Sequence, residues 1–168
     1  MSSERERRFG DIAATVTEPV RRFLRRRVDA DTADDVLADT LLVCWRRLDE
    51  VPAGPEALPW AYAVARHALA NVERSSRRQR RLAHRITVMD PPTETIPFDE
   101  EADPRVAEAL KRLRPDQAEL LRLWAWEQLG AAEIATVLHI SANAASIRLH
   151  RAKGKFKEIW ADLKDQAE

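Results

Sequence analysis

The sequence lacks several features that would assign a protein to a familiar class. It has a single cysteine, Cys44, so an internal disulfide is excluded, and the apolar periodicity around it predicts a buried, unreactive thiol. Uncharged stretches such as 58–65 are far shorter than the roughly 20 apolar residues of a membrane span. No apolar core follows the charged N-terminus, so no signal peptide is predicted. We therefore expect a cytoplasmic protein without membrane insertion.

Signatures of catalysis and of metal binding are also missing. The histidines show no metal-ligand spacing with one another or with the cysteine, and there is neither a glycine-rich phosphate loop nor a nucleophile elbow. The carboxylate pairs Asp34–Asp35 and Glu100–Glu101 are successive residues, which do not share one helical face. We therefore expect no enzymatic activity, no cofactor and no bound metal.

The net charge is zero, but the charges are unevenly distributed along the 168 residues. Residues 1–86 contain 17 Lys and Arg against 13 Asp and Glu, and residues 105–168 contain 11 against 9. Residues 87–104 contain six carboxylates, four prolines and no basic residue, without apolar periodicity. This composition predicts an extended, self-repelling linker. The expected organisation is two small domains, 1–86 and 105–168, joined by an acidic, proline-rich linker.

The first block shows the apolar periodicity of three amphipathic helices. The first of them carries Phe23 on its apolar stripe, and the second spans 31–48, with Thr32 and Asp35 as a capping pair at its start. The third is expected to start at Pro59, because the missing N–H of proline would have no helical partner at a first position. This helix runs through Trp60, Val64, Ala68 and Val72.

The second block is also predicted to be helical. Helices are expected to start at Pro104 and at Pro115, and the second of these should turn Ala118, Leu121 and Trp124 inward. A short helix at 130–138 and a long helix capped by Ser141 follow. No segment alternates as a strand does, so the expected fold class is all-α.

The last two helices have the spacing of a helix-turn-helix, whose second helix can occupy the major groove of DNA. The small residues Ala135 and Ala145 would let the helices approach closely, and His139 takes the turn position where glycine is commoner. The exposed side of the second helix is expected to carry groups suited to phosphates and base edges, namely Ser146, Arg148, His150, Arg151, Lys153, Lys155 and Lys157. Spacing alone leaves open a helical hairpin whose basic face is only solvated.

The helix that starts at Pro59 combines aromatic and basic residues. Trp60 and Tyr62 lie in its first half, and residues 71–85 contain six arginines and one glutamate. Rings that stack on bases, beside cations that follow the backbone, are typical of single-stranded nucleic-acid binding. The alternative is that the two aromatic side chains belong to the core.

The segment 33–48 presents an acidic face beside its apolar stripe. A partner helix could dock against this face. The alternative is an ordinary amphipathic helix of the core.

Taken in order, these segments resemble an extracytoplasmic-function (ECF) sigma factor of bacterial RNA polymerase. The likeness rests on 33–48, on PWAYAVARHALAN at 59–71, on LKRLRPDQAELL at 110–121 and on IRLHRAK at 147–153. It covers nearly the whole chain apart from the ends and the linker. The resemblance implies a non-enzymatic protein that gives RNA polymerase its promoter specificity.

The resemblance also implies roles for individual residues. Contacts with core RNA polymerase would come from Asp34, Asp35, Asp39, Thr40 and Trp45. The promoter −10 element would be melted and held by Trp60, Arg66, Asn71, Arg74, Arg77 and Arg78. The −35 element would be contacted by Ser146, Arg148, Arg151, Lys153 and Lys155. The acidic linker would follow the RNA exit path, and an anti-sigma factor is a further partner that the resemblance suggests.

The chain departs from the family pattern at several positions. Ala38 stands where glutamine is usual, and His67 where many members have asparagine. Residues 142–145 read Ala-Asn-Ala-Ala in place of an acidic residue followed by Gly-Thr-Val, which affects the expected promoter sequence. The main rival interpretation is a conventional helix-turn-helix regulator that is not a polymerase subunit.

Overall fold

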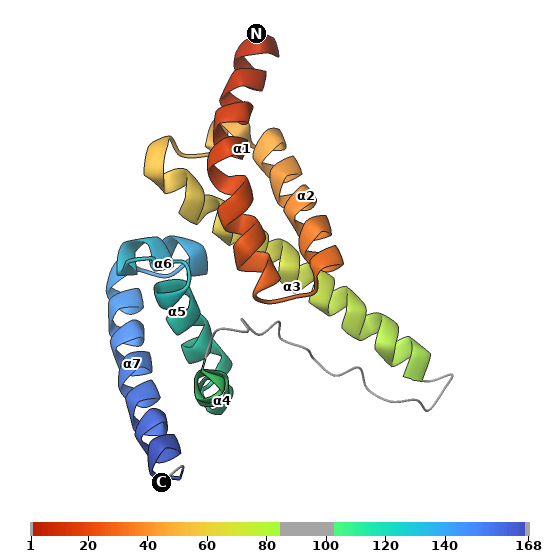
Figure 1. The fold of residues 1–168 in the computed structure, drawn as a ribbon. Coiled ribbons are helices and arrows are strands. Elements are labelled where there is room, and N and C mark those ends of the chain that lie inside the picture. Colours follow the sequence, from red (N-terminus) through yellow and green to blue (C-terminus); the bar gives the residue numbers. More distant parts are fainter. Residues whose placement is uncertain (1, 85–102, 167–168) are drawn as a thin grey trace. The chain divides into compact units, whose positions relative to one another are not determined.

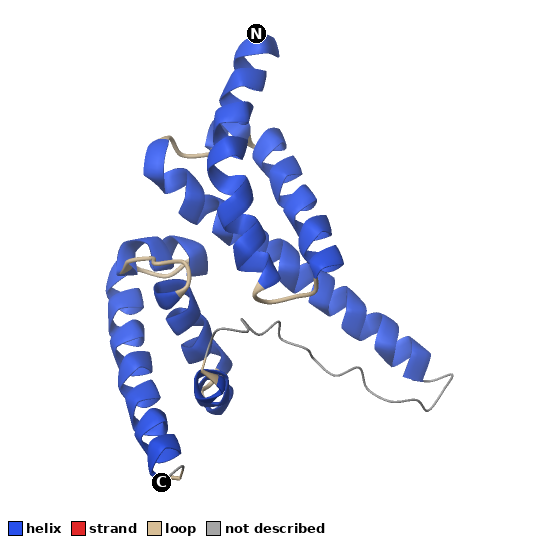
Figure 2. Ribbon diagram, viewed as in Figure 1, coloured by secondary structure: helices blue, strands red, loops and turns tan. Residues whose placement is uncertain are grey.

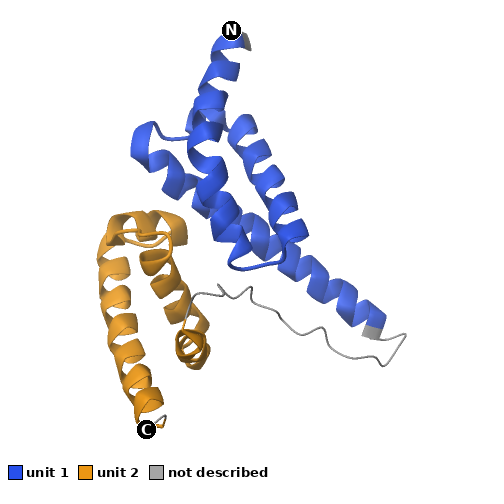
Figure 3. Cartoon of the chain, in the orientation of Figure 1, with its two compact units in different colours: residues 1–97 blue, residues 98–168 orange. Residues whose placement is uncertain are grey.

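A computed structural model describes residues 2–84 and 103–166 of the chain. Across these residues every regular element is a helix, which confirms the all-α prediction (Figure 2). The chain divides into two compact units, residues 1–97 and 98–168 (Figure 3). The expected linker at 87–104 lies outside the described residues except for its last two positions, so its boundaries stay a prediction. In both described ranges, no helix combines the length and the apolar character needed to cross a membrane.

Within residues 2–84 the first unit contains three helices and two short 3-10 turns (Figure 1): α1 (Ser2–Arg25), α2 (Ala30–Arg46), the turns Leu48–Glu50 and Gly54–Glu56, and α3 (Ala57–His84). Each helix packs against the other two. Val16, Val20 and Phe23 of α1 are fully buried, and the Phe23 ring lies 5.2 Å from the ring of Tyr62 on α3. The apolar stripe predicted for the first helix therefore forms the centre of this core.

The start of α2 differs from the prediction. Asp29 caps the helix, because its side chain accepts the backbone N–H of Thr32 at 2.9 Å and the Thr32 hydroxyl at 2.7 Å. These hydrogen bonds hold the pKa of Asp29 below its usual value. The predicted pairing of Thr32 with Asp35 is wrong, since Thr32 already lies in the first helical turn. Cys44 is fully buried and burial raises the pKa of its thiol, as the sequence predicts for an inert cysteine.

α3 begins at Ala57, two residues before Pro59, and it packs on the core through Ala57, Ala61, Tyr62, Ala65 and Leu69. The predicted series from Trp60 to Val72 is only half-buried and flanks this face. Beyond Leu69 no described residue of α3 is buried, and Figure 1 shows this half of the helix continuing past the ends of α1 and α2. α3 is therefore a core helix in its first half and a projecting helix in its second.

The described part of the second unit, residues 103–166, contains four helices: α4 (Pro104–Arg112), α5 (Pro115–Ala125), α6 (Ala131–Leu138) and α7 (Ala142–Asp165). α7 packs against each of the other three. The inward face of α5 carries Ala118 and Leu121 as predicted, together with Leu123. Trp124 is 43% exposed, so its predicted place in the core is wrong.

Candidate functional site

The turn between α6 and α7 has a fixed backbone geometry. His139 adopts the left-handed conformation, with φ 53°. Its N–H donates to the Thr136 carbonyl at 3.4 Å, and the N–H of Ile140 donates to the Ala135 carbonyl at 3.1 Å. This pair of bonds is the Schellman arrangement that ends a helix, where glycine usually takes the left-handed position. Ser141 then caps α7, because its Oγ accepts the N–H of Ala144 at 3.0 Å, which confirms the predicted cap.

Replacing His139 by glycine should stabilise the second unit by about 0.5 to 1 kcal/mol. The left-handed conformation costs a residue with a Cβ atom about 1 to 2 kcal/mol, and the greater freedom of glycine in the unfolded chain removes part of that gain. Hydrogen exchange of the α6 and α7 amides measures the local change in free energy. His139→Ala is the control, since it keeps the Cβ atom and should bring no gain. Equal exchange in the glycine variant and the wild type would show that the turn is unstrained.

Close packing fixes the angle between α6 and α7. Ala135 and Ala145 are both buried, and the side chains of Ile134 and Leu149 are buried with them. The opposite side of α7 is open to solvent and carries most of the predicted polar and basic residues in exposed positions, namely Ser146, Arg148, His150, Arg151, Lys155 and Lys157. The second unit thus presents a rigid helix with an exposed, mainly basic face, as a helix-turn-helix requires.

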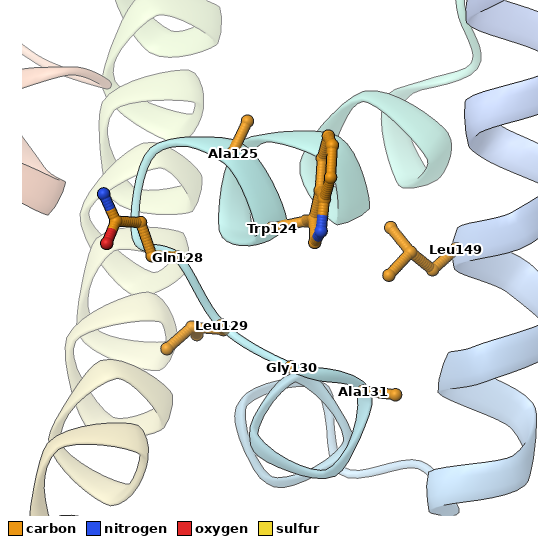
Figure 4. A pocket seen from close by; sticks show the side chains of 7 residues that line it. All are labelled: Trp124, Ala125, Gln128, Leu129, Gly130, Ala131 and Leu149. Carbon is orange, nitrogen blue, oxygen red and sulfur yellow. The ribbon is translucent and has the colours of Figure 1, made fainter.

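Lys153 is placed differently from the other cations of α7. It is half-buried, and its Nζ lies 3.8 Å from the centroid of the Trp124 ring, in a cation–π contact. Trp124 also lines an open depression of about 580 Å³ between the end of α5, the following turn and α7, where Figure 4 shows its indole beside Leu149. Lys153 therefore has a protein partner that holds its ammonium group away from the exposed face.

Of the residues predicted to contact the −10 element, Asn71, Arg74, Arg77 and Arg78 lie on the projecting half of α3, whereas Trp60 and Arg66 lie on its first half. At about 100° per residue, Trp60, Asn71, Arg74 and Arg78 lie along one side of the helix, and Arg66 and Arg77 along an adjoining side. All of these arginines and Asn71 are exposed, and Trp60 is half-buried. The Arg74 guanidinium donates a hydrogen bond to the side-chain oxygen of Asn71. The structure thus brings the predicted residues onto two neighbouring exposed stripes of one helix.

Trp60 itself has a cationic neighbour. The Arg47 guanidinium lies 5.5 Å from the centroid of the Trp60 ring, and it also pairs with Glu50. Hydrogen bonding to Arg47 lowers the pKa of Glu50. One face of the indole is therefore next to a positive charge that is held by its own carboxylate.

The residues predicted to contact core polymerase separate into two groups. Asp34, Asp35 and Asp39 are exposed on α2. Thr40 is fully buried, and its hydroxyl donates to the Val36 carbonyl at 2.7 Å, so it does not reach that surface. Trp45 is half-buried under α1, where it meets the Phe9 ring edge-on at 5.3 Å and the Arg5 guanidinium at 5.4 Å.

A residue that the sequence pattern did not single out lies on the same face of α2. Leu42 is 43% exposed, and it falls one helical turn after Ala38 and Asp39. Its position outside the buried stripe, next to the acidic residues, is the signal that could have revealed it. The acidic face of α2, defined here by Asp34, Asp35, Asp39 and Leu42, therefore has an apolar contact point. Among the described residues, no group of His, Cys, Asp or Glu side chains could hold a metal ion.

Comparison with known proteins identifies the family. The family model for sigma-70, region 4 matches residues 104–156, which include the helix-turn-helix. The RNA polymerase sigma factor CarQ of Myxococcus xanthus is 29% identical over 163 residues, covering 92% of this chain and 90% of that protein. The ECF RNA polymerase sigma factor SigL of Mycobacterium tuberculosis is 30% identical over 135 residues, covering 77% and 75%. The chain belongs to the ECF sigma factors.

Two solved structures share the fold of this sigma factor. The sigma factor RpoE of Bartonella quintana, in complex with the anti-sigma factor NepR, superposes with a TM-score of 0.65 at 21% identity, covering 90% of this chain and 95% of that chain. CnrH, in complex with the cytosolic domain of CnrY, superposes with a TM-score of 0.63 at 22% identity, covering 94% and 90%. These likenesses support the all-helical fold.

Family membership decides between the two readings of the sequence. As an ECF sigma factor, the protein binds core RNA polymerase and promoter DNA and directs transcription initiation. The prediction of a sigma factor is confirmed, and a conventional helix-turn-helix regulator is not favoured. The roles of individual residues rest on the geometry described above, and they are proposals.

Proposed function

We propose that the projecting half of α3 melts the −10 element and holds the unpaired strand. The main support is that no described residue of α3 after Leu69 is buried and that this half of the helix is rich in arginine. A helix with no packing partner in its own unit gains stability from an external one, and a row of guanidinium groups suits a phosphate backbone. Asn71 and Arg74, joined by a hydrogen bond, offer a donor and acceptor pair to a base. Trp60, on the same side of the helix, offers a ring for stacking.

Replacing Asn71 or Arg74 by alanine should weaken open-complex formation on a linear promoter more than on one with a pre-melted −10 bubble. Unpairing costs a few kcal/mol, and a template that is already unpaired needs no help with this step. Open-complex formation on both templates, measured by permanganate reactivity of unpaired thymines, provides the comparison. Arg80→Ala is the matched control, because it removes the same charge from a different side of α3 and should affect both templates alike. If all three variants lose open-complex formation equally on both templates, Asn71 and Arg74 contribute only general affinity for DNA.

We further propose that α7 enters the major groove of the −35 element. The support is the rigid turn at His139 and Ser141 together with the exposed row of Ser146, Arg148 and Arg151. Lys155 is exposed and can reach phosphates, although it pairs with Glu158 at 3.0 Å in the free protein. Lys153 contributes less to DNA binding in this proposal, because it rests on Trp124.

For core RNA polymerase we propose the acidic face of α2 as the contact surface. Its three carboxylates suit a basic partner, and Leu42, one helical turn after Asp39, adds an apolar contact beside them. Thr40 and Trp45 act inside the unit in this proposal, by packing α2 against its neighbours. The contacts of Trp45 with Arg5 and Phe9 of α1 support that role.

An anti-sigma factor and a cytoplasmic location complete the proposal. Support for the partner is that the two solved structures named above are complexes, one with the anti-sigma factor NepR and one with the cytosolic domain of CnrY. We propose no enzymatic activity, since sigma factors act by binding. The overall test is reconstitution: the purified chain with core polymerase should start transcription from a random promoter pool that core alone cannot use. Failure to comigrate with core and to start transcription would contradict the proposal.

A further inference from the structure

Ile147 is an exposed, large apolar residue of the recognition helix α7. Its side chain is 44% exposed. The buried side of this part of the helix is formed by Ala145, Leu149 and Ala152, and Ile147 lies roughly 170° away from its centre at 100° per residue. Ile147 therefore points directly away from the core of its unit.

The fold of the second unit gives no reason for isoleucine at this position. A β-branched side chain lowers helix propensity relative to alanine or lysine, and an exposed one gains little from burial in the free protein. The residues one turn to either side on the same stripe, Asn143, His150 and Arg151, are exposed and polar. Among the described residues of α7, no other large apolar side chain is exposed, so Ile147 is not part of an apolar patch of this helix that would suit a protein partner. A surface that binds this side of α7 must therefore accept one aliphatic side chain among several hydrogen-bonding side chains.

The major groove of DNA has this chemistry. Base edges there present hydrogen-bond donors and acceptors, and the C5-methyl group of thymine is the apolar group among them. We propose that Ile147 reads a thymine of the −35 element through contact with this methyl group. The inference rests on the proposed placement of α7 in the major groove. Asn143 and Arg151, one turn before and after Ile147, hydrogen-bond to adjoining base edges and hold the aliphatic side chain against the groove.

The test removes the methyl group from the DNA and the side chain from the protein. The full chain is bound to core polymerase, and a promoter is recovered from a pool with a random −35 element. Each −35 thymine on either strand is then replaced by uracil, which lacks only the methyl group. With the wild type, one replacement should weaken promoter binding about fourfold, which corresponds to about 0.8 kcal/mol for one buried carbon. With Ile147→Ala, the same replacement should have no effect.

Controls separate this contact from general effects. Asp162→Ala removes an exposed side chain near the C-terminal end of α7 and should keep the fourfold response to uracil. Alanine at 147 should leave the helix content unchanged, because it is a better helix former. If no uracil replacement weakens wild-type binding, or if the loss persists in Ile147→Ala, the inference is wrong. If α7 does not read the −35 element at all, the result is different: scrambling the entire −35 element then leaves promoter binding by the wild type unchanged.

Discussion

Changing Asp39 to arginine and Leu42 to alanine together should abolish comigration with core RNA polymerase on gel filtration. Both side chains are exposed on α2, and Leu42 keeps 43% of its surface open in the free protein. Interface hot spots cost at least about 2 kcal/mol when truncated, which is about thirtyfold in affinity. Reversing the neighbouring charge adds repulsion against a basic partner. The expected loss is therefore larger than thirtyfold, while the helical circular dichroism stays that of the wild type.

The choice of residues matters for this experiment. Trp45→Ala is a poor probe, because Trp45 packs against Phe9 and carries the Arg5 guanidinium beside its ring. Loss of a packed tryptophan costs about 3 to 5 kcal/mol and could unfold the first unit. Asp11→Arg is the matched control for the double variant, since it makes the same charge change at an exposed position of α1. If the folded double variant still comigrates with core RNA polymerase, the polymerase contact lies on another surface.

Local signals in the sequence predicted most of the elements correctly. Ser141 could be recognised as a cap because capping depends on a side chain and an N–H three residues later. The core stripe of α1 was recognisable because Val16, Val20 and Phe23 repeat at helical spacing with polar residues between them. These features need no knowledge of the rest of the chain.

The errors have tertiary causes. In α3 the sequence contains two apolar stripes one position apart. The stripe with the larger side chains was predicted to face the core, and this prediction is wrong. The structure buries Ala61 and Ala65 instead, because small side chains let neighbouring helices approach closely. Thr40 counts as polar in any periodicity, yet its hydroxyl is satisfied by the Val36 carbonyl, so its burial leaves no polar group without a partner.

The sequence pattern also could not predict contacts between side chains of different helices. Trp124 falls at the helical spacing of the buried residues of α5, but it lies where that helix ends beside α7. It therefore meets the Lys153 ammonium group instead of the core. This pairing of residues from α5 and α7 changes the expectation for DNA binding, since Lys153 is half-buried against an aromatic ring whereas Lys155 is exposed.

The recognition helix should distinguish residues that read bases from residues that hold the backbone. If Arg148 or Arg151 contacts a guanine edge through two hydrogen bonds, its replacement by alanine should cost about 1 to 3 kcal/mol and relax the preference at one −35 position. Both side chains are exposed on α7, so neither replacement opens a cavity. The measurement is promoter binding by the holoenzyme across a library of single-base −35 changes, at two or more salt concentrations.

The lysines provide the contrast. Lys155→Ala should weaken all promoters alike and reduce the slope of log affinity against log salt by about one, because it removes one phosphate contact. Lys153→Ala should change that slope less, since the Lys153 ammonium lies 3.8 Å from the Trp124 ring centroid. Ser141→Ala should cost about 1 kcal/mol of stability and disturb both kinds of contact together, because it removes the cap that positions α7. If the arginine and lysine variants lose affinity without selectivity, α7 only clamps phosphates, and −35 specificity must come from the shape of the promoter.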